Sequence, residues 1–162
     1  MNIETERKFL VRDSSYKDFE TGCHAVKQGY IAHDGGNTVR VRILDGKGVL
    51  TIKGPSGPAG MSRAEWEMEI PAGDALELFE LCHGGKVEKI RHIVPAGGGR
   101  CFEVDEFFGE NEGLVMAEIE LGSEDEVFVR PTWLGEEVTG NRHYYNSFLT
   151  KCPYKSWPEE WK

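Results

Sequence analysis

The amino-acid sequence predicts a mainly β (α+β) fold: an eight-stranded antiparallel β-barrel, or tunnel, with a charged lumen and a few flanking helices. Three observations lead to this prediction. The 162 residues are close to the usual size of one domain. Glycine-rich turn signals interrupt the chain at short, regular intervals. Between them lie short β-type runs of alternating charged and apolar residues, and parallel strands would need more intervening helix than the chain offers.

Eight segments have the alternation that is typical of strands. The expected strands cover residues 3–11, 25–32, 38–44, 48–54, 64–71, 87–94, 101–108 and 114–121. Most of them are joined by turn sequences of only a few residues. One of these turns, at 97–99, consists of three glycines, but no GK[ST] follows as in a phosphate-binding loop. We therefore interpret it as a hairpin turn.

Helix signals are fewer and lie at the joins between strands. Residues 74–83 are expected to be helical, with Asp74 as N-cap and Gly84 as the stop, and Ser123 and Glu126 form a capping-box pattern. The other helices are expected at 14–19, 123–129 and 141–151. Residues 153–162 have no clear period. We treat them as a C-terminal tail that follows a domain spanning 1–152.

Composition excludes several classes of protein. The net charge of −9 disfavours non-specific binding to nucleic acid or to a membrane surface. No apolar run is long enough for a membrane-spanning helix, and the first residues do not resemble a signal peptide, so we expect a cytoplasmic protein. The four cysteines lack CxxC spacing and are expected to be free thiols. The five histidines lack metal-ligand spacing.

Seven of the eight expected strands carry a charged face, because alternate residues of a strand point the same way. The cations of these faces are Lys8, Arg40, Arg42, Lys53, Lys89 and Arg91, and the acids are Glu4, Glu6, Glu65, Glu67, Glu69, Glu103, Asp105, Glu118 and Glu120. Such a face often simply meets water. Two features favour an interior location instead: like charges cluster by strand, and Ser, Thr and Gln are almost missing. The apolar face would then need to be covered by the helices.

A charged interior of this kind suits one class of ligand. Carboxylates are hard ligands for Mg²⁺ or Mn²⁺, and Arg and Lys bind phosphate oxygens. An eight-stranded barrel is wide enough to hold one small molecule. The sequence therefore predicts a site for a metal-complexed polyphosphate.

Several motifs resemble those of the CYTH domain, the triphosphate tunnel metalloenzymes. ETERK at residues 4–8 matches the ExExK signature of that family. The resemblance continues in order through QGY at 28–30, TVRVRI at 38–43, LTIKG at 50–54, R-x-E-x-E at 63–67, EKIR at 88–91, FEVDEF at 102–107 and GLVMAEIEL at 113–121. It extends to the segment WLGEEVTGNRHYYNS at 133–147 and so covers nearly the whole chain. Two departures are His92 and His143, where the family commonly has other residues.

The resemblance implies roles for the charged residues. The implied metal ligands are Glu4, Glu6, Asp105, Glu118 and Glu120, and the implied phosphate ligands are Lys8, Arg40, Arg42, Lys53, Arg63, Lys89 and Arg91. Glu4, Glu6, Lys8 and Glu120 are the implied catalytic residues, and Glu65, Glu67 and Glu103 are further acids of the tunnel. The cofactor is expected to be Mg²⁺ or Mn²⁺, and the protein a monomer or homodimer.

The function that the sequence favours is metal-dependent hydrolysis of inorganic tripolyphosphate to pyrophosphate and phosphate. Cations would hold the chain in line while metal and carboxylates orient the attacking water. Two alternatives lie in the same family: adenylate cyclase, and thiamine or nucleoside triphosphatase. No aromatic cluster or acidic pocket for a base or for thiamine is evident. A third alternative is a non-catalytic polyphosphate-binding protein, although cations alone would suffice for that role.

Overall fold

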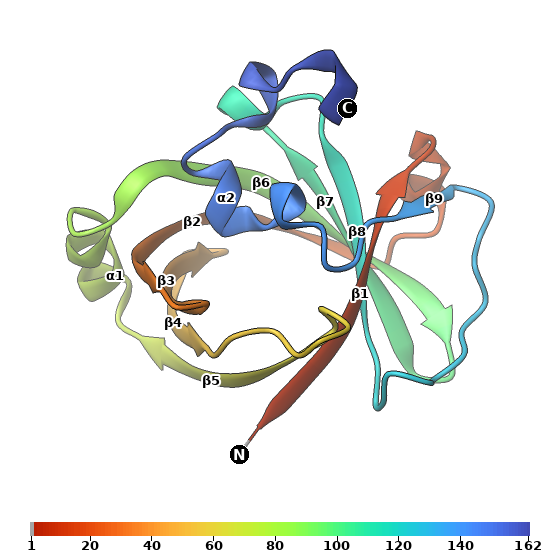
Figure 1. Cartoon of the computed structure of the whole chain (residues 1–162), viewed down its shortest axis with the longest axis horizontal. Helices are drawn as coiled ribbons and strands as arrows, with labels where there is room; N and C mark the ends of the chain where they lie inside the picture. Colours follow the sequence, from red (N-terminus) through yellow and green to blue (C-terminus); the bar gives the residue numbers. More distant parts are fainter. Residues whose placement is uncertain (1) are drawn as a thin grey trace.

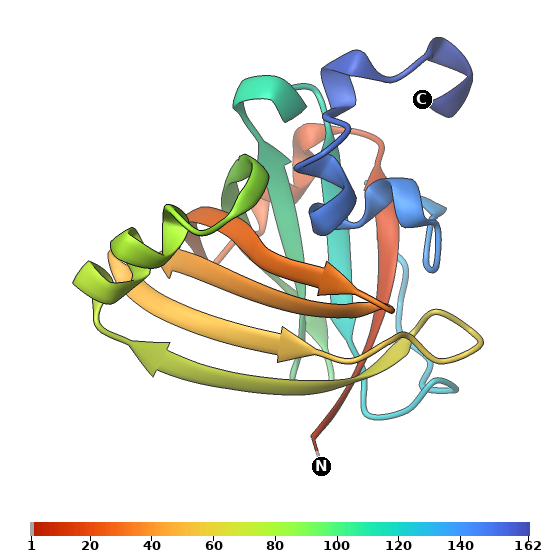
Figure 2. The same ribbon diagram turned by 60° about the vertical axis from the view of Figure 1, so that its left-hand side comes forward.

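The computed structural model describes residues 2–162, and eight of its strands close into a barrel (Figures 1 and 2). The strands of the ring are β1 (Ile3–Val11), β2 (Gly22–Asp34), β3 (Asn37–Leu44), β4 (Lys47–Lys53), β5 (Ser62–Ile70), β6 (His83–Gly97), β7 (Arg100–Phe107) and β8 (Val115–Glu120). They follow the order β5-β4-β3-β2-β6-β7-β8-β1, and β1 pairs with β5 to close the ring. Every pairing is antiparallel. The predicted barrel is confirmed.

A ninth strand, β9 (Leu134–Glu137), was not predicted from the sequence. The first half of β1 pairs with β5, and its second half pairs with β9, through Phe9 and Val11. β9 thus pairs with the part of β1 that extends beyond its pairing with β5. Four residues with the sequence LGEE are too short and too polar to show strand alternation.

Tight hairpins connect several strands, as the turn signals predicted. β3 and β4 are joined by Asp45 and Gly46, which both have positive φ angles, 48° and 79°. This is the type I′ geometry that two-residue hairpins favour, and it explains the Asp-Gly pair. The glycines at 97–99 lie at the β6–β7 turn, so their interpretation as a hairpin turn is confirmed.

Apolar side chains cover the outside of the barrel wall in two clusters. One lies over β1, β6, β7 and β8, where Phe9, Phe102 and Ile119 pack with Tyr16 and Trp133 from the connecting segments. The other lies over β2–β4 and is covered by α1 (Ala72–Phe79). The core of this protein is therefore outside the ring, as the inward-facing charges require.

A third cluster closes one end of the barrel, and we call it the apolar plug. At that end the inward-facing positions of β6, β7 and β8 become apolar, at Val87, Phe107 and Met116. Leu149 and Trp157 from the C-terminal segment pack against them. The rest of the cluster consists of Leu114, Val138 and Tyr144. The segment at 153–162 thus contributes Trp157 to the closed end.

Part of the outer apolar face is left uncovered. Trp66 and Met68 of β5 point outward and are 47% and 54% exposed, and their neighbours Ile52 and Ile3 are also exposed. The expectation that helices cover the whole apolar face is therefore wrong here. The only helix of two turns among residues 2–162, α1, lies over β2–β4 instead.

The helical predictions were partly wrong. The segment at 14–19 forms a 3₁₀ helix, Ser14–Asp18, but α1 begins two residues before Asp74 and ends at Phe79. Residues 123–129 form turns rather than a helix. The expected helix at 141–151 is broken at Tyr145, which has extended backbone angles, into the 3₁₀ helix Arg142–Tyr144 and α2 (Asn146–Leu149).

Short 3₁₀ turns complete the described chain, at Gly109–Asn111, Tyr154–Ser156 and Glu159–Trp161. No helix in residues 2–162 has the length and apolar character needed to cross a membrane. The four cysteines are free, as predicted.

The plug generates a prediction about stability. Trp157 is 3% exposed, so Trp157→Ala should lower the free energy of unfolding by about 3–5 kcal/mol, the usual cost of emptying a buried aromatic site. Urea denaturation measures this loss. Trp161→Ala is the control, because Trp161 is 36% exposed and should cost much less. Equal losses for both variants would show that the segment at 153–162 does not help to close the barrel.

Candidate active site

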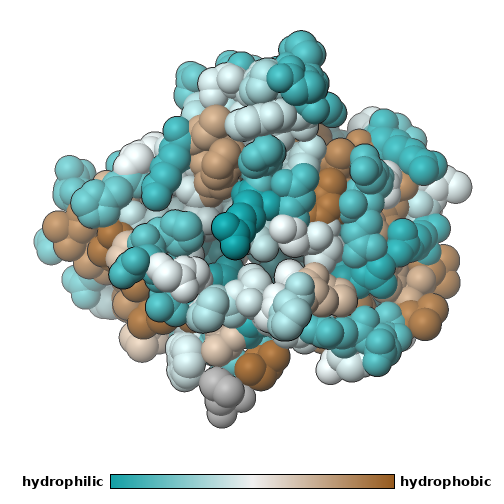
Figure 3. All heavy atoms as spheres, viewed as in Figure 1, coloured by the Kyte–Doolittle hydropathy of each residue, from teal (hydrophilic) through white to brown (hydrophobic). Residues whose placement is uncertain are grey.

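The barrel encloses a cavity of about 220 Å³ lined almost entirely by polar and charged side chains. Figure 3 shows hydrophilic residues gathered around a hollow near the centre of the face drawn there. Every charged residue predicted from the sequence lines this cavity except Asp105 and Glu69. The lining contains the seven cations Lys8, Arg40, Arg42, Lys53, Arg63, Lys89 and Arg91 and the seven acids Glu4, Glu6, Glu65, Glu67, Glu103, Glu118 and Glu120.

The two kinds of charge are separated around the wall. Apart from Lys8 and Arg63, the cations come from the strands β4, β3 and β6. Between β3 and β6 lies β2, which brings no charged side chain to the cavity. The acids come from β7, β8, β1 and β5, which complete the ring. We call these two parts of the wall the cationic arc and the acidic arc. The cavity is therefore positive on one side and negative on the other.

Carboxylates crowd together on the acidic arc. Glu6 pairs across the strands with Glu120, and its side chain shares a hydrogen bond with that of Glu118. Burial, followed by the charges of Glu118 and Glu4, raises the pKa of Glu6 to about 8. Burial and the nearby Glu4 also raise the pKa of Glu120. Two carboxyl groups that share a proton are a site that a cation can occupy instead.

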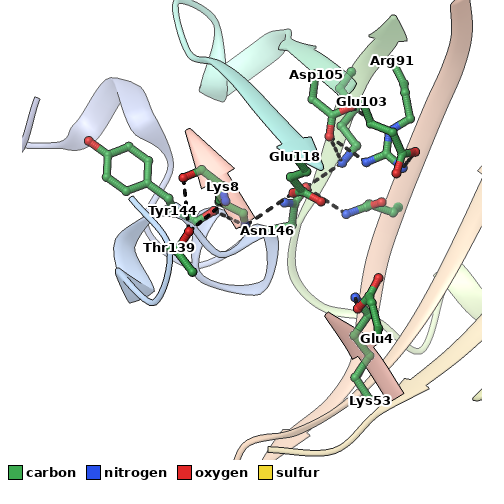
Figure 4. Close-up of polar contacts among 12 residues, drawn as sticks. Glu4, Lys8, Lys53, Arg91, Glu103, Asp105, Glu118, Thr139, Tyr144 and Asn146 are labelled. Atoms are coloured by element: carbon green, nitrogen blue, oxygen red, sulfur yellow. Dashed lines mark hydrogen bonds and ion pairs between the residues drawn. The ribbon is translucent and has the colours of Figure 1, made fainter. Parts of the chain in front are cut away.

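Asp105 lies on the inner face of β7, opposite Arg91 of β6, and orients two members of the cationic arc. Its oxygens are 2.8 Å from Arg91 Nε and 2.7 Å from Lys89 Nζ, and Arg91 also donates to Glu103 at 2.7 Å (Figure 4). Burial opposes the charge of Asp105, yet Arg91 and Lys89 hold its pKa below the usual range. Burial and Arg91 lower the pKa of Lys89 to about 7, although Asp105 opposes that shift. The ion pairs among these four side chains therefore fix their positions.

The remaining cations are held by acceptors around the opening. Lys53 Nζ is 2.5 Å from Glu4 and 3.3 Å from Glu65. Arg40 donates to the Thr51 hydroxyl at 3.1 Å, while its Nε is buried with no partner in the described part of the chain. Arg63 donates to the carbonyl oxygens of Gly54 and Gly36 at 2.8 and 3.0 Å, so it ties two turns together.

Lys8 is the cation of β1 that lines the cavity, and it links the acidic arc to the C-terminal segment. Its Nζ is 3.5 Å from Glu118 and donates to the carbonyl oxygen of Tyr144 at 3.2 Å. The Lys8 ammonium also lies 5.4 Å from the Tyr145 ring centre. Burial lowers its pKa, but Glu118 and Glu6 outweigh that effect and raise it. Lys8 therefore stays charged.

Sequence reasoning missed the neutral side chains of the cavity. These are Tyr30, Thr38, Thr51, Ser56, Met61, Thr139, Tyr145, Asn146 and Ser147. Alternation could have found Thr38 and Thr51, because they share a face with Arg40 and Lys53. No sequence signal places Asn146 beside Lys89, because the two are 57 residues apart and meet only when α2 folds over the ring.

A divalent metal fits the acidic arc chemically. No group of three or more His, Cys, Asp or Glu side chains is preassembled as a metal site within residues 2–162. Glu4, Glu6, Glu118 and Glu120 nevertheless place oxygen ligands on one wall, and these are the ligands of Mg²⁺ and Mn²⁺. Asp105 differs from the expectation, because the cations already occupy both of its oxygens. Its setting is that of a positioning residue.

Comparisons with known proteins agree with this geometry. A model of the CYTH domain matches residues 2–152. An inorganic triphosphatase of Acetivibrio thermocellus is 49% identical over 160 residues, 98% of this chain and 100% of that protein. An inorganic triphosphatase of Nitrosomonas europaea is 34% identical over 149 residues, 90% of this chain and 95% of that protein. The chain also superposes on the crystal structure of an inorganic triphosphatase with a TM-score of 0.66 and 32% sequence identity. The match covers 93% of this chain and 95% of the chain in that crystal structure.

The burial of Asp105 generates a prediction. Asp105→Asn removes the buried anion that Lys89 and Arg91 share and leaves Arg91 only its contact with Glu103, so the free energy of unfolding should fall by about 3–5 kcal/mol. Urea denaturation measures the loss. Glu103→Gln is the matched control, because Glu103 also contacts Arg91 but its side chain is 35% exposed; it should cost no more than about 1 kcal/mol. A loss for Asp105→Asn as small as that of the control would contradict this account.

Proposed function

The chain belongs to the CYTH domain family, and from that premise we propose that it hydrolyses inorganic tripolyphosphate to pyrophosphate and phosphate in a metal-dependent reaction. The relatives from Acetivibrio thermocellus and Nitrosomonas europaea are both inorganic triphosphatases. The observation that carries the proposal is the separation of a cationic arc from an acidic arc around one cavity.

The charge balance of the cavity explains why a metal is needed. Its seven cations and seven acids nearly compensate one another, so the tunnel has little net charge with which to attract a highly anionic chain. A tripolyphosphate can bind to the cationic arc if divalent cations compensate the acidic arc and the remaining phosphate charge. The two arcs thus provide one surface for phosphate and another for metal.

Residues of the cationic arc are proposed to bind the phosphate chain. Lys53, Arg40, Arg42, Lys89 and Arg91 present ammonium and guanidinium donors to the same cavity. Lys8 and Arg63 add donors from the opposite strands. Charge that develops on the leaving pyrophosphate would be stabilised by these donors, which are already oriented before the reaction.

Glu4, Glu6, Glu118 and Glu120 are proposed to hold Mg²⁺ or Mn²⁺. When bound, such an ion polarises phosphoryl oxygens and acidifies water. The described residues that line the cavity include no histidine or cysteine, so no side-chain nucleophile is paired with an imidazole base. This supports direct attack by water on a phosphorus atom, with a carboxylate of the acidic arc orienting it.

The proposed setting is a cytoplasmic protein acting on a small molecule, either as a monomer or as a homodimer. The four free thiols suit a reducing compartment. The cavity is enclosed by the barrel wall, which suits a small triphosphate better than a nucleic acid.

Phosphate release from tripolyphosphate in the presence of Mg²⁺ tests the proposal. We expect turnover that excess EDTA abolishes, and a higher kcat/KM for tripolyphosphate than for ATP or thiamine triphosphate. ATP, if used, should yield ADP or AMP. Full activity in excess EDTA would contradict the metal dependence, and cyclic AMP as the main product from ATP would replace hydrolysis by cyclisation.

Removing one carboxylate from the acidic arc should impair the reaction without unfolding the barrel. Glu6→Gln is expected to lower kcat/KM at least about 100-fold, the scale that follows the loss of a positioned catalytic group. Its melting temperature should stay the same or rise, because crowding with Glu118 and Glu4 is relieved. Glu67→Gln is the control, since Glu67 lies at the exposed edge of the cavity. Equal activity losses in both variants would contradict the assigned role of Glu6.

The cationic arc should distinguish ligands by chain length. Arg42→Ala is expected to weaken binding of tripolyphosphate more than binding of pyrophosphate, because the third phosphoryl group adds charge that Arg42 shares with the other cations. Calorimetry with Mg²⁺ measures both affinities. Lys27→Ala, which removes an exposed cation from the outer face of β2, is the control and should change neither. Equal losses for both ligands in Arg42→Ala would show that the tunnel does not sense chain length.

A further inference from the structure

Two uncharged amides, Gln28 and Asn146, connect the two strands of the cationic arc that flank β2. Gln28 is fully buried on β2, and its Oε1 accepts from Arg42 Nε at 2.9 Å. Its Nε2 donates to Asn146 Oδ1 at 3.0 Å. The same Asn146 oxygen accepts from Lys89 Nζ at 2.9 Å (Figure 4). A single relay thus runs from Arg42 through both amides to Lys89.

The two cations determine which way each amide points. Arg42 and Lys89 can only donate hydrogen bonds, so each must face an amide oxygen. Arg42 therefore turns the Gln28 oxygen toward itself, which leaves the Gln28 NH₂ group to face Asn146. Lys89 can only donate, so it independently requires that Asn146 Oδ1, rather than its NH₂ group, faces Lys89 and the Gln28 NH₂ group. Both requirements agree, so the orientation follows from donor chemistry as well as from the coordinates.

The fixed orientation leaves the NH₂ group of Asn146 for the cavity. Asn146 lines the tunnel, whereas Gln28 does not. Both acceptor directions of Oδ1 are occupied, and Asn146 Nδ2 has no hydrogen-bond acceptor among residues 2–162. The segment that contributes Asn146, α2, packs against β2 and β6 at the gap that β2 leaves in the cationic arc. An oriented donor therefore lies in that gap.

We propose that Asn146 is a further substrate-binding residue, whose NH₂ group donates to a phosphoryl oxygen of the triphosphate, and that Gln28 is the positioning residue that holds this amide in its donating orientation. The proposal rests on the proposed function, because it assigns a contact within the same site. It adds a neutral donor, brought by α2, to a set of cations that the strands provide. Such a donor matches deprotonated phosphoryl oxygens, which only accept hydrogen bonds.

Asn146→Asp tests the direct contact. An aspartate side chain has the same shape and can still accept from Lys89 and Gln28, so a merely structural role of Asn146 would be preserved. The second oxygen, however, replaces the donor by an acceptor that faces the phosphate. We expect KM for tripolyphosphate, measured with saturating Mg²⁺, to rise at least about 10-fold, the scale of losing a hydrogen bond to a charged group. The melting temperature should remain near that of the wild type.

Asn141→Asp is the matched control. Asn141 lies five residues earlier, caps the 3₁₀ helix Arg142–Tyr144 through its Oδ1, is exposed and does not line the cavity. The Asn141→Asp variant therefore introduces the same negative charge outside the cavity and retains the oxygen that caps the 3₁₀ helix. A KM for Asn146→Asp equal to that of Asn141→Asp would overturn the assigned contact.

Gln28→Glu tests the positioning role without touching the cavity. A glutamate side chain retains the acceptor for Arg42. If Gln28 only holds Arg42, this variant should therefore leave KM for tripolyphosphate unchanged. Its second oxygen faces Asn146 and would turn the Asn146 NH₂ group away from the tunnel. We expect KM for tripolyphosphate to rise in the wild-type background but not when Gln28→Glu is added to Asn146→Ala. An equal rise in both backgrounds would overturn the relay.

Failure of this inference is distinguishable from failure of the proposed function. If the wild type neither binds nor hydrolyses tripolyphosphate with Mg²⁺, the proposed function is wrong and the inference falls with it. If the wild type does both while Asn146→Asp matches its control, only the inference is wrong. Should Asn146→Asp fail to fold, calorimetry of tripolyphosphate binding to Gln28→Glu decides instead: unchanged affinity overturns the inference, and weakened affinity supports it.

Discussion

Lys89 and Arg91 share one buried carboxylate, Asp105, and the rest of the structure depends on keeping such charges compensated inside a closed barrel. Buried ions lose the hydration that they have in water, and their mutual attraction must replace it. The ring does this by placing cations and acids on adjoining strands. Asp105 is 1% exposed and satisfies two cations at once, which makes it the central member of this network.

The placement of compensated charges inside the barrel determines where the hydrophobic core lies. Because most inward-facing residues around the cavity are charged, the residues that alternate with them are largely apolar and face outward. The hydrophobic core is therefore divided into clusters on the outer wall and a plug at one end, each covered by a connecting segment. The outer face of β5 has no such cover, so Trp66 and Met68 stay exposed.

The same network of buried charges orients the hydrogen-bond donors of the cavity before an anion binds. Donors that are held by buried acceptors do not need to reorganise when an anion binds, and this is the condition under which electrostatic stabilisation is most effective. The acidic arc has the opposite character, because burial and the neighbouring Glu118 raise the pKa of Glu6 to about 8. Its carboxylates are under-compensated in the protein alone, which suits them to a divalent ion. One wall is therefore complete by itself, and the other requires a cofactor.

The sequence by itself determined the barrel and its inward-facing charges, because the period of two is local and each strand carries it independently. Six cations and seven acids of the cavity could be predicted in this way, through residues such as Arg40, Arg42, Glu118 and Glu120, whereas Arg63 was implied only by the family motif. Tertiary structure alone decided that Lys89 and Arg91 occupy both oxygens of Asp105, that β9 pairs with the end of β1, and that the segment at 123–129 is not a helix. It also decided that Asn146 faces Lys89. These outcomes depend on contacts between residues far apart in the chain, and a local period carries no information about which distant side chains will meet.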